Sequence, residues 1–88
     1  MKTAAELKTM ALSEIANLIS RDWRATSPKG VNYAAKPYLE AMQCLNDVKD
    51  NYGADNGKSI VLYFLGNASS YRGEQAKAIK LELKNRLK

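Results

Sequence analysis

Apolar residues recur at helical spacing from near the start of the chain. Over residues 3–23 they fall three or four positions apart, which places them on one face of an α-helix; the set is Leu7, Ala11, Ile15, Leu18, Ile19 and Trp23. Thr3 and Glu6 have the spacing of a capping box, whose two side chains accept hydrogen bonds from amides at a helix start. We therefore predict a first helix over residues 3–23, either continuous or broken near residues 9–12, with Trp23 as a large anchor at its end.

A loop and a second helix follow. In the segment RATSPKG (residues 24–30), Pro28 disfavours helix for the residue before it, which predicts a loop. Pro37 is tolerated in the first turn of a helix, where its missing N–H would have no partner. Apolar positions around it share one helical side and predict a second helix at about residues 35–48; they are Ala34, Tyr38, Ala41, Met42, Leu45 and Val48.

The most apolar run of the chain lies at residues 60–65. It follows a polar connection over residues 46–57, at the end of which Asp55 and Asn56 are placed to cap a helix. Taken alone, the run fits a buried strand as well as a helix, because Val, Ile, Tyr and Phe favour strands. A lone strand would leave its backbone groups without partners, and no second strand-like run exists. We therefore predict a buried helix at the centre of the fold.

The chain closes with an amphipathic, basic helix. The turn at residues 66–70 precedes it, and Ser69 or Ser70 is placed to cap it. Its core face is predicted to comprise Ala76, Ile79, Leu83 and Leu87. The fold class is therefore all-α: one domain over residues 1–88, built as a compact array of about four short helices with the third helix central.

Charge is distributed unevenly. The net charge is +5, from 14 basic and 9 acidic residues. Residues 1–50 carry 7 basic and 6 acidic side chains, whereas residues 51–88 carry 7 and 3. The excess therefore lies in the second part of the chain, where it fits either an anionic partner or a surface that keeps the protein soluble.

The last helix carries the sharpest candidate site. Four lysines fall within roughly an 80° sector of it, with one leucine among them. Cations on a helix face can meet phosphates, but they also complement the negative C-terminal end of the helix dipole. The weak outline of a helix-turn-helix over residues 60–86 is a further nucleic-acid signal. The candidate binding residues are Arg72, Lys77, Lys80, Leu81, Lys84 and Lys88.

Asp22 and Arg72 form a second candidate constellation. Each falls near the apolar side of its own helix, and a charge in that position needs a partner. We predict that they pair across the bundle with Trp23 and Tyr71 beside them; the alternative is that both extend into solvent. Glu82 and Arg86 are predicted to be an i,i+4 pair on another side of the last helix, worth only a few tenths of a kcal/mol.

Catalysis is disfavoured by the residue types present. The chain has no histidine, so Cys44 lacks the usual base of a nucleophilic thiol and is predicted to be a half-buried structural residue. Asp47, Asp50 and Asp55 lack the spacing and closing glutamate of a calcium-binding loop. We therefore predict no enzyme, no catalytic residue, no metal site, no cofactor and no small-molecule substrate.

The chain resembles a group of small, uncharacterised helical proteins encoded by phages and prophages. The segment that carries the resemblance is YGADNGKSIVLYFLGNASSYRGEQAKAIKLELK (residues 52–84), together with Asp22-Trp23 and YAAKPYLEAM (residues 33–42). The resemblance implies a viral origin and a location in the bacterial host cytoplasm. It implies no activity and no binding residues.

Two functions remain open. The first is a non-enzymatic accessory protein that binds another host or phage protein, with self-association through Leu81 as a variant. The second is a nucleic-acid-binding protein that contacts phosphates through the last helix. A lone cysteine and the lack of a signal-like apolar stretch at the start favour the cytoplasm, and the apolar run at residues 60–65 is too short to cross a membrane.

Overall fold

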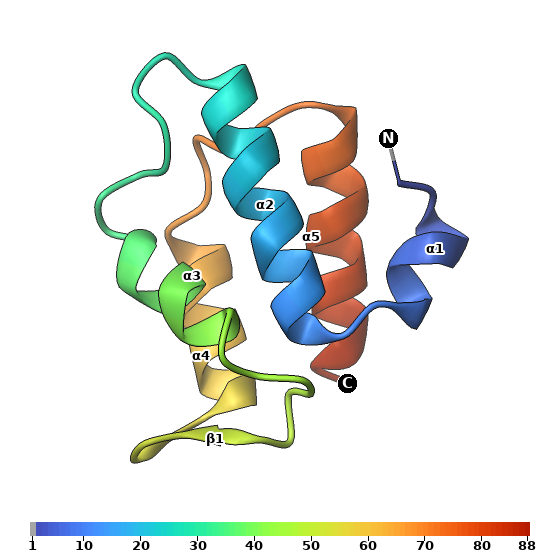
Figure 1. The fold of residues 1–88 in the computed structure, drawn as a ribbon, viewed down its shortest axis with the longest axis vertical. Coiled ribbons are helices and arrows are strands. Elements are labelled where there is room, and N and C mark those ends of the chain that lie inside the picture. Colours follow the sequence, from blue (N-terminus) through green and yellow to red (C-terminus); the bar gives the residue numbers. More distant parts are fainter. Residues whose placement is uncertain (1) are drawn as a thin grey trace.

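The computed structural model describes residues 2–88 and shows five helices and one short hairpin, so Met1 of the predicted domain lies outside it. The elements are α1 (Ala4–Thr9), α2 (Leu12–Thr26), α3 (Lys36–Met42), β1 (Asn51–Tyr52), β2 (Asp55–Asn56), α4 (Gly57–Gly66) and α5 (Glu74–Arg86) (Figure 1). They form a flattened body with extents of 33 × 29 × 18 Å. The prediction of a compact helical fold is confirmed, with one more helix than expected and a small hairpin.

The first predicted helix is broken into α1 and α2. Thr3 and Glu6 form the capping box of α1, as predicted. Met10 and Ala11 then take extended backbone angles, and the amide of Ala11 donates to the Glu14 carboxylate over 2.8 Å. Glu14 therefore starts a second helix within the segment where a break was left open.

Helix α2 occupies the middle of the array. It packs against α3 on one side and against α5 on the other, while α4 packs on α3 and α1 packs on α5 (Figure 1). The prediction that the third helix, now α4, is central and buried all round is wrong. Leu62 and Tyr63 of α4 are 58% and 52% exposed, because α4 is covered mainly by α3 and so has an open side.

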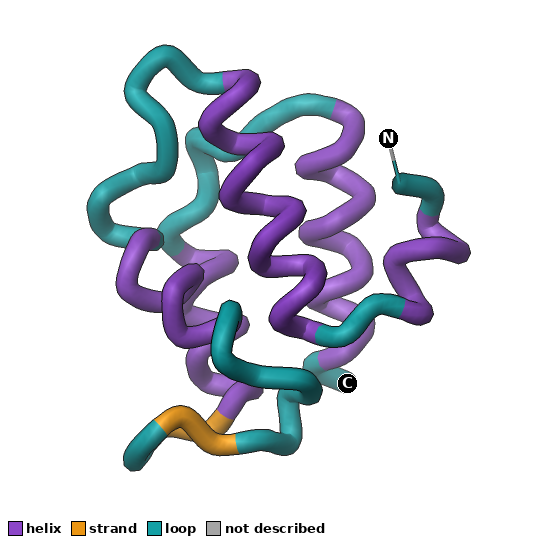
Figure 2. The backbone as a smooth tube through the Cα atoms, viewed as in Figure 1, coloured by secondary structure: helices purple, strands orange, loops and turns teal. Residues whose placement is uncertain are grey.

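The second predicted helix ends earlier than the apolar pattern indicated. Helix α3 stops at Met42, yet Leu45 and Val48 remain buried because turns carry them back under the core. Asp50 stabilises one of these turns by accepting hydrogen bonds from the amides of Asn46 and Asp47. The hairpin of β1 and β2 then leads directly into α4 (Figure 2).

Helix α4 begins as the sequence predicts. Asn56 is its N-cap, and its side chain accepts a hydrogen bond from the amide of Ser59 over 2.8 Å. Residues 60–65 are helical, so the alternative of a buried strand is excluded. Gly57, the first residue of the helix, lies so close to the backbone of Val48 that a Cβ there would come within 2.7 Å of the Val48 carbonyl oxygen.

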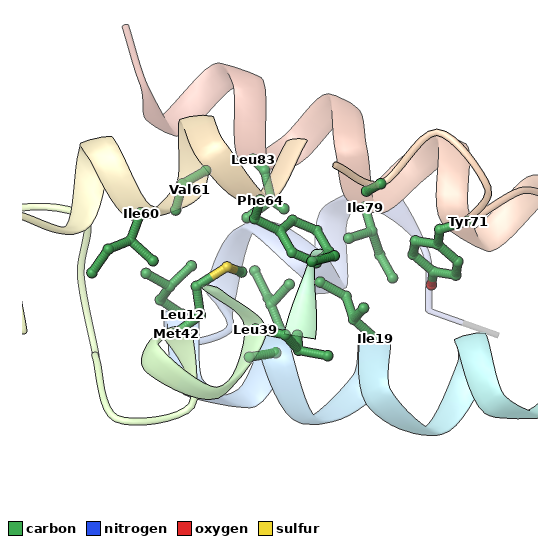
Figure 3. Close-up of a cluster of buried hydrophobic side chains, with 14 of the residues drawn as sticks. Leu12, Ile19, Leu39, Met42, Ile60, Val61, Phe64, Tyr71, Ile79 and Leu83 are labelled. Carbon is green, nitrogen blue, oxygen red and sulfur yellow. The ribbon is translucent and has the colours of Figure 1, made fainter. Parts of the chain in front are cut away.

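The core fills the space between α2, α3, α4 and α5 (Figure 3). Trp23 is fully buried at one end of it, stacked on Tyr71 at 5.0 Å between ring centroids and edge-on to Phe64 at 6.2 Å. Apolar side chains complete it, among them Leu12, Ile19, Leu39, Met42, Ile60, Val61, Ile79 and Leu83. Trp23 is therefore the anchor that the sequence predicted.

None of the helices within residues 2–88 has both the length and the apolar character required to cross a membrane.

Candidate functional site

Helix α5 presents the predicted binding residues, and its start is set by a glycine. Gly73 is the N-cap with a φ of +117°, a backbone angle that residues with a side chain rarely adopt. No side chain caps the helix, so the prediction that Ser69 or Ser70 would do so is wrong. The sharp change of direction at Gly73 lets the chain leave the α4–α5 loop and run back along α2.

The core face of α5 agrees with the prediction. Ala76, Ile79 and Leu83 are buried, and Leu87 is partly buried against them. The remaining face points outward. Its exposed residues include Lys77, Leu81 and Lys84, which are spaced four and three residues apart and so share one stripe of the helix. Lys88 is also exposed but follows the helix, which ends at Arg86, so the prediction that it belongs to the helical stripe is wrong.

Leu81 lies in the middle of this stripe, which together with Lys88 we call the α5 outer face (Lys77, Leu81, Lys84 and Lys88). Its side chain is 60% exposed. Ion pairs within residues 2–88 join Lys2 to Glu6 and Glu82 to Arg86, so the three lysines around Leu81 pair with no acid of the described chain. The prediction of an exposed leucine among lysines is confirmed.

Lys80 departs from the other lysines of the helix. Its ammonium group donates to the carbonyl oxygen of Tyr71 over 2.6 Å and lies 5.7 Å from the centroid of the Tyr71 ring. Burial lowers the pKa of Lys80, and the positive charges of Lys84 and Arg72 lower it further. Lys80 is therefore held against the α4–α5 loop, close to other cations, and is only partly available to a partner.

The predicted pair of Asp22 and Arg72 does not form. The carboxylate of Asp22 accepts a hydrogen bond from the hydroxyl of Tyr71 over 2.7 Å, whereas Arg72 is exposed and its Nε donates to the carbonyl of Ser69 over 3.3 Å. Burying a neutral hydroxyl beside a carboxylate costs less than burying a guanidinium group. Tyr71, stacked on Trp23, therefore takes the inward position that was predicted for Arg72.

The Tyr71 hydroxyl is strongly affected by this environment. Burial raises its pKa, and the hydrogen bond to the carboxylate of Asp22 raises the pKa further. The phenol therefore keeps its proton in the folded protein. Tyr71 acts here as a neutral hydrogen-bond donor that joins α2 to the α4–α5 loop.

Arg86 has a larger role than the sequence indicated. It pairs with Glu82 at 2.7 Å, and the two side chains are only 17% and 9% exposed. Its Nη2 also donates to the carbonyl oxygens of Leu7 at 2.8 Å and Met10 at 2.7 Å. Arg86 therefore clamps the end of α1 onto α5, and the prediction of a weak surface pair is wrong.

One sequence signal for this clamp existed. At 100° per residue, Glu82 lies about 60° from Ile79, at the margin of the apolar face of α5, and an acid that is buried there needs a charged partner.

Cys44 is exposed, with its Sγ 3.8 Å from the carbonyl of Glu40. The prediction that it is half-buried is wrong, because α3 has already ended and Cys44 lies in a turn. Among residues 2–88, no group of three or more Cys, Asp or Glu side chains is placed to hold a metal ion.

Comparisons with known proteins found no matching family model, no matching curated protein and no matching solved structure.

Proposed function

We propose that this chain is a small, non-enzymatic accessory protein that binds an acidic surface of another protein through the α5 outer face. The observation that carries the proposal is the exposed Leu81 with Lys77 and Lys84 one helical turn to either side. A leucine in contact with a partner removes apolar area from water, and flanking lysines select a surface that carries carboxylates. The fitting partner therefore offers an apolar contact bordered by acidic side chains.

The same face suits a nucleic acid less well. Cations bind phosphates favourably, but a leucine at the centre of the contact adds no favourable interaction with a phosphate. Lys80, one of the four lysines counted from the sequence, is already bonded to the Tyr71 carbonyl. Phosphate contact along this face would therefore use three lysines around an apolar obstacle, which favours a protein partner.

Self-association through the same face is disfavoured by charge. A two-fold dimer brings the same patch of both copies together. Lys77 and Lys84 of one copy would then face the lysines of the other, and like charges in contact repel. The partner is therefore proposed to be a different protein, a host or phage protein of the bacterial cytoplasm in keeping with the resemblance described above.

Affinity capture from a bacterial lysate, with and without nuclease treatment, tests this proposal. The bait is the wild-type chain, Leu81→Ala, or the control Leu62→Ala, which truncates a similarly exposed leucine on α4. We expect wild type and Leu62→Ala to retain the same acidic protein and Leu81→Ala to lose it. All three should unfold within about 0.5 kcal/mol of one another, because the truncated side chains are exposed.

Capture that is unchanged in Leu81→Ala would refute the use of the α5 outer face. Capture that disappears on nuclease treatment would show that nucleic acid, and not a protein surface, is the ligand.

A further inference from the structure

A second cationic surface lies at the end of the molecule where two loops meet. The α2–α3 loop and the α4–α5 loop run side by side at the top of the view (Figures 1 and 2). Hollows in the surface follow this junction. The first is lined by Arg24, Lys29 and Lys36, together with Ser27 and Pro28.

Neighbouring hollows share lining residues with it and so continue it. The second hollow contains Ser27 and Pro28 of the first and adds Thr26, Ser70 and Arg72. A third contains Arg72 and adds Lys77 and Lys80 beside the start of α5. We call the cationic residues of the three hollows the basic track: Arg24, Lys29, Lys36, Arg72, Lys77 and Lys80.

Acidic side chains are scarce along the basic track. Glu74 is the one acid that lines any of the three hollows, and the carboxylate of nearby Asp22 is already bonded to the Tyr71 hydroxyl. Asp50 and Asp55 lie in the hairpin region at the opposite end of the molecule (Figure 1). Six cations are therefore gathered with Glu74 as the one acid among them, an arrangement that an anion would stabilise.

The shape of the track favours a chain of anions over a single one. Its hollows succeed one another across two loops, so a ligand that fills them must be extended. Ser27 and Ser70 line the second hollow beside Arg72, and their hydroxyls can donate to phosphate oxygens, whereas the hydroxyl of Thr26 already donates to the carbonyl oxygen of Trp23. A repeating phosphate backbone matches this alternation of cations and hydroxyls.

An exposed aromatic ring accompanies the track. Tyr33 is 90% exposed and lies in the chain between Val31 and Lys36, both of which line the first hollow. A basic groove with an exposed aromatic ring is the usual arrangement for binding single strands, whose bases are free to stack. The paired bases of a duplex offer no such face, and a peptide rich in carboxylates would leave the ring unused.

We propose that the basic track binds the backbone of a single-stranded nucleic acid and that Tyr33 stacks on one of its bases. This site shares Lys77 with the α5 outer face, but its other cations and Tyr33 lie outside that face, and the proposal does not rest on the Leu81 contact. It also differs from the phosphate contact predicted along α5, because four of its six cations, Arg24, Lys29, Lys36 and Arg72, lie outside α5.

Binding of a fluorescent oligothymidine, longer than about 16 nucleotides so that it can span the track, tests the proposal by anisotropy at low salt. The charge-reversal variant K29E/K36E is compared with K49E/K58E, which makes the same change in net charge at exposed lysines near the hairpin. We expect K29E/K36E to weaken binding by at least about tenfold and to reduce the log–log salt slope by about 1.4, because each phosphate contact to a single strand contributes about 0.7. At about 0.15 M salt, where the Debye length is about 8 Å, K49E/K58E should stay within about threefold of wild type, since charges at the far end of the molecule are then screened.

The contribution of the ring is tested separately. Tyr33→Ala should weaken binding by at least about fivefold, while Tyr33→Phe, which keeps the ring, and Tyr52→Ala, which removes a half-exposed ring on the hairpin, should not. Absence of binding at low salt, or equal losses in K29E/K36E and K49E/K58E, would overturn the proposal. So would displacement of the strand by polyglutamate at an equal concentration of charge, because the track would then bind acidic peptides equally well.

Discussion

Replacing Arg86 with alanine removes the clamp between α1 and α5. The variant loses two hydrogen bonds from a charged donor to the carbonyl oxygens of Leu7 and Met10, each worth about 1.5–3 kcal/mol. It also leaves Glu82, only 9% exposed, without its partner, and breaking a buried pair in this way costs about 3–5 kcal/mol. These contributions overlap because one side chain makes them all, so we expect a loss of about 3–5 kcal/mol in the free energy of unfolding.

That loss is large for a chain of this size. At the usual stability per residue, 88 residues have a free energy of unfolding of roughly 4–13 kcal/mol. Arg86→Ala should therefore lower the melting temperature by at least roughly 12 °C. Urea unfolding followed by circular dichroism measures the free energy directly.

Two further variants isolate the cause. Arg86→Ala leaves the charge of Glu82 without a partner, and Glu82→Gln removes that charge. The double variant should therefore be destabilised by about 0.5–3 kcal/mol less than the sum of the two single variants. Lys84→Ala, an exposed change on the same helix, should stay within about 0.5 kcal/mol of wild type. An Arg86→Ala protein that unfolds within about 1 kcal/mol of wild type would refute the clamp.

Other perturbations test the packing of α4 and the Tyr71 hydrogen bond. Gly57→Ala should lower the free energy of unfolding in urea by about 1–3 kcal/mol, because the added Cβ meets the Val48 backbone at 2.7 Å. Gly66→Ala, with open space around the glycine, should be neutral or stabilising by up to about 1 kcal/mol. Equal effects at both sites would contradict the close approach of Gly57 to Val48. The raised pKa of Tyr71 means that its contribution is complete below the unfolded pKa of about 10 and is lost above it, by up to about 1.4 kcal/mol per pH unit. Tyr71→Phe should abolish that part of the alkaline loss in melts recorded between about pH 9 and 11, and an unchanged pH dependence would contradict the buried bond to Asp22.

Local patterns determined much of what the sequence could predict. Helical spacing identified the apolar face of α5 and the burial of Trp23, because side chains three and four positions apart share one side of a helix. Asn56 was identified as a cap because its side chain serves an amide only three residues away. Leu81 among exposed lysines followed from the same spacing. Each of these features depends on residues within a few positions of one another.

Other features were decided by contacts between distant segments. Tyr71 and Arg72 are neighbours in the chain, and only the path of the α4–α5 loop settles which of them turns inward to Asp22, 49 positions from Tyr71 in sequence. Arg86 reaches the Leu7 carbonyl across 79 positions, so its importance does not follow from the i,i+4 pattern with Glu82.

The two candidate surfaces differ in the same way: one follows from a local sequence pattern and the other from contacts between distant segments. Apart from Lys88, the α5 outer face is a single helical stripe, and the sequence by itself determined it through the 3.6-residue period. The basic track joins Arg24 and Lys29 to Arg72, which are separated by more than 40 positions in the chain. Only the tertiary structure placed them together, because the burial of Trp23 against Tyr71 draws the two loops to the same end of the molecule.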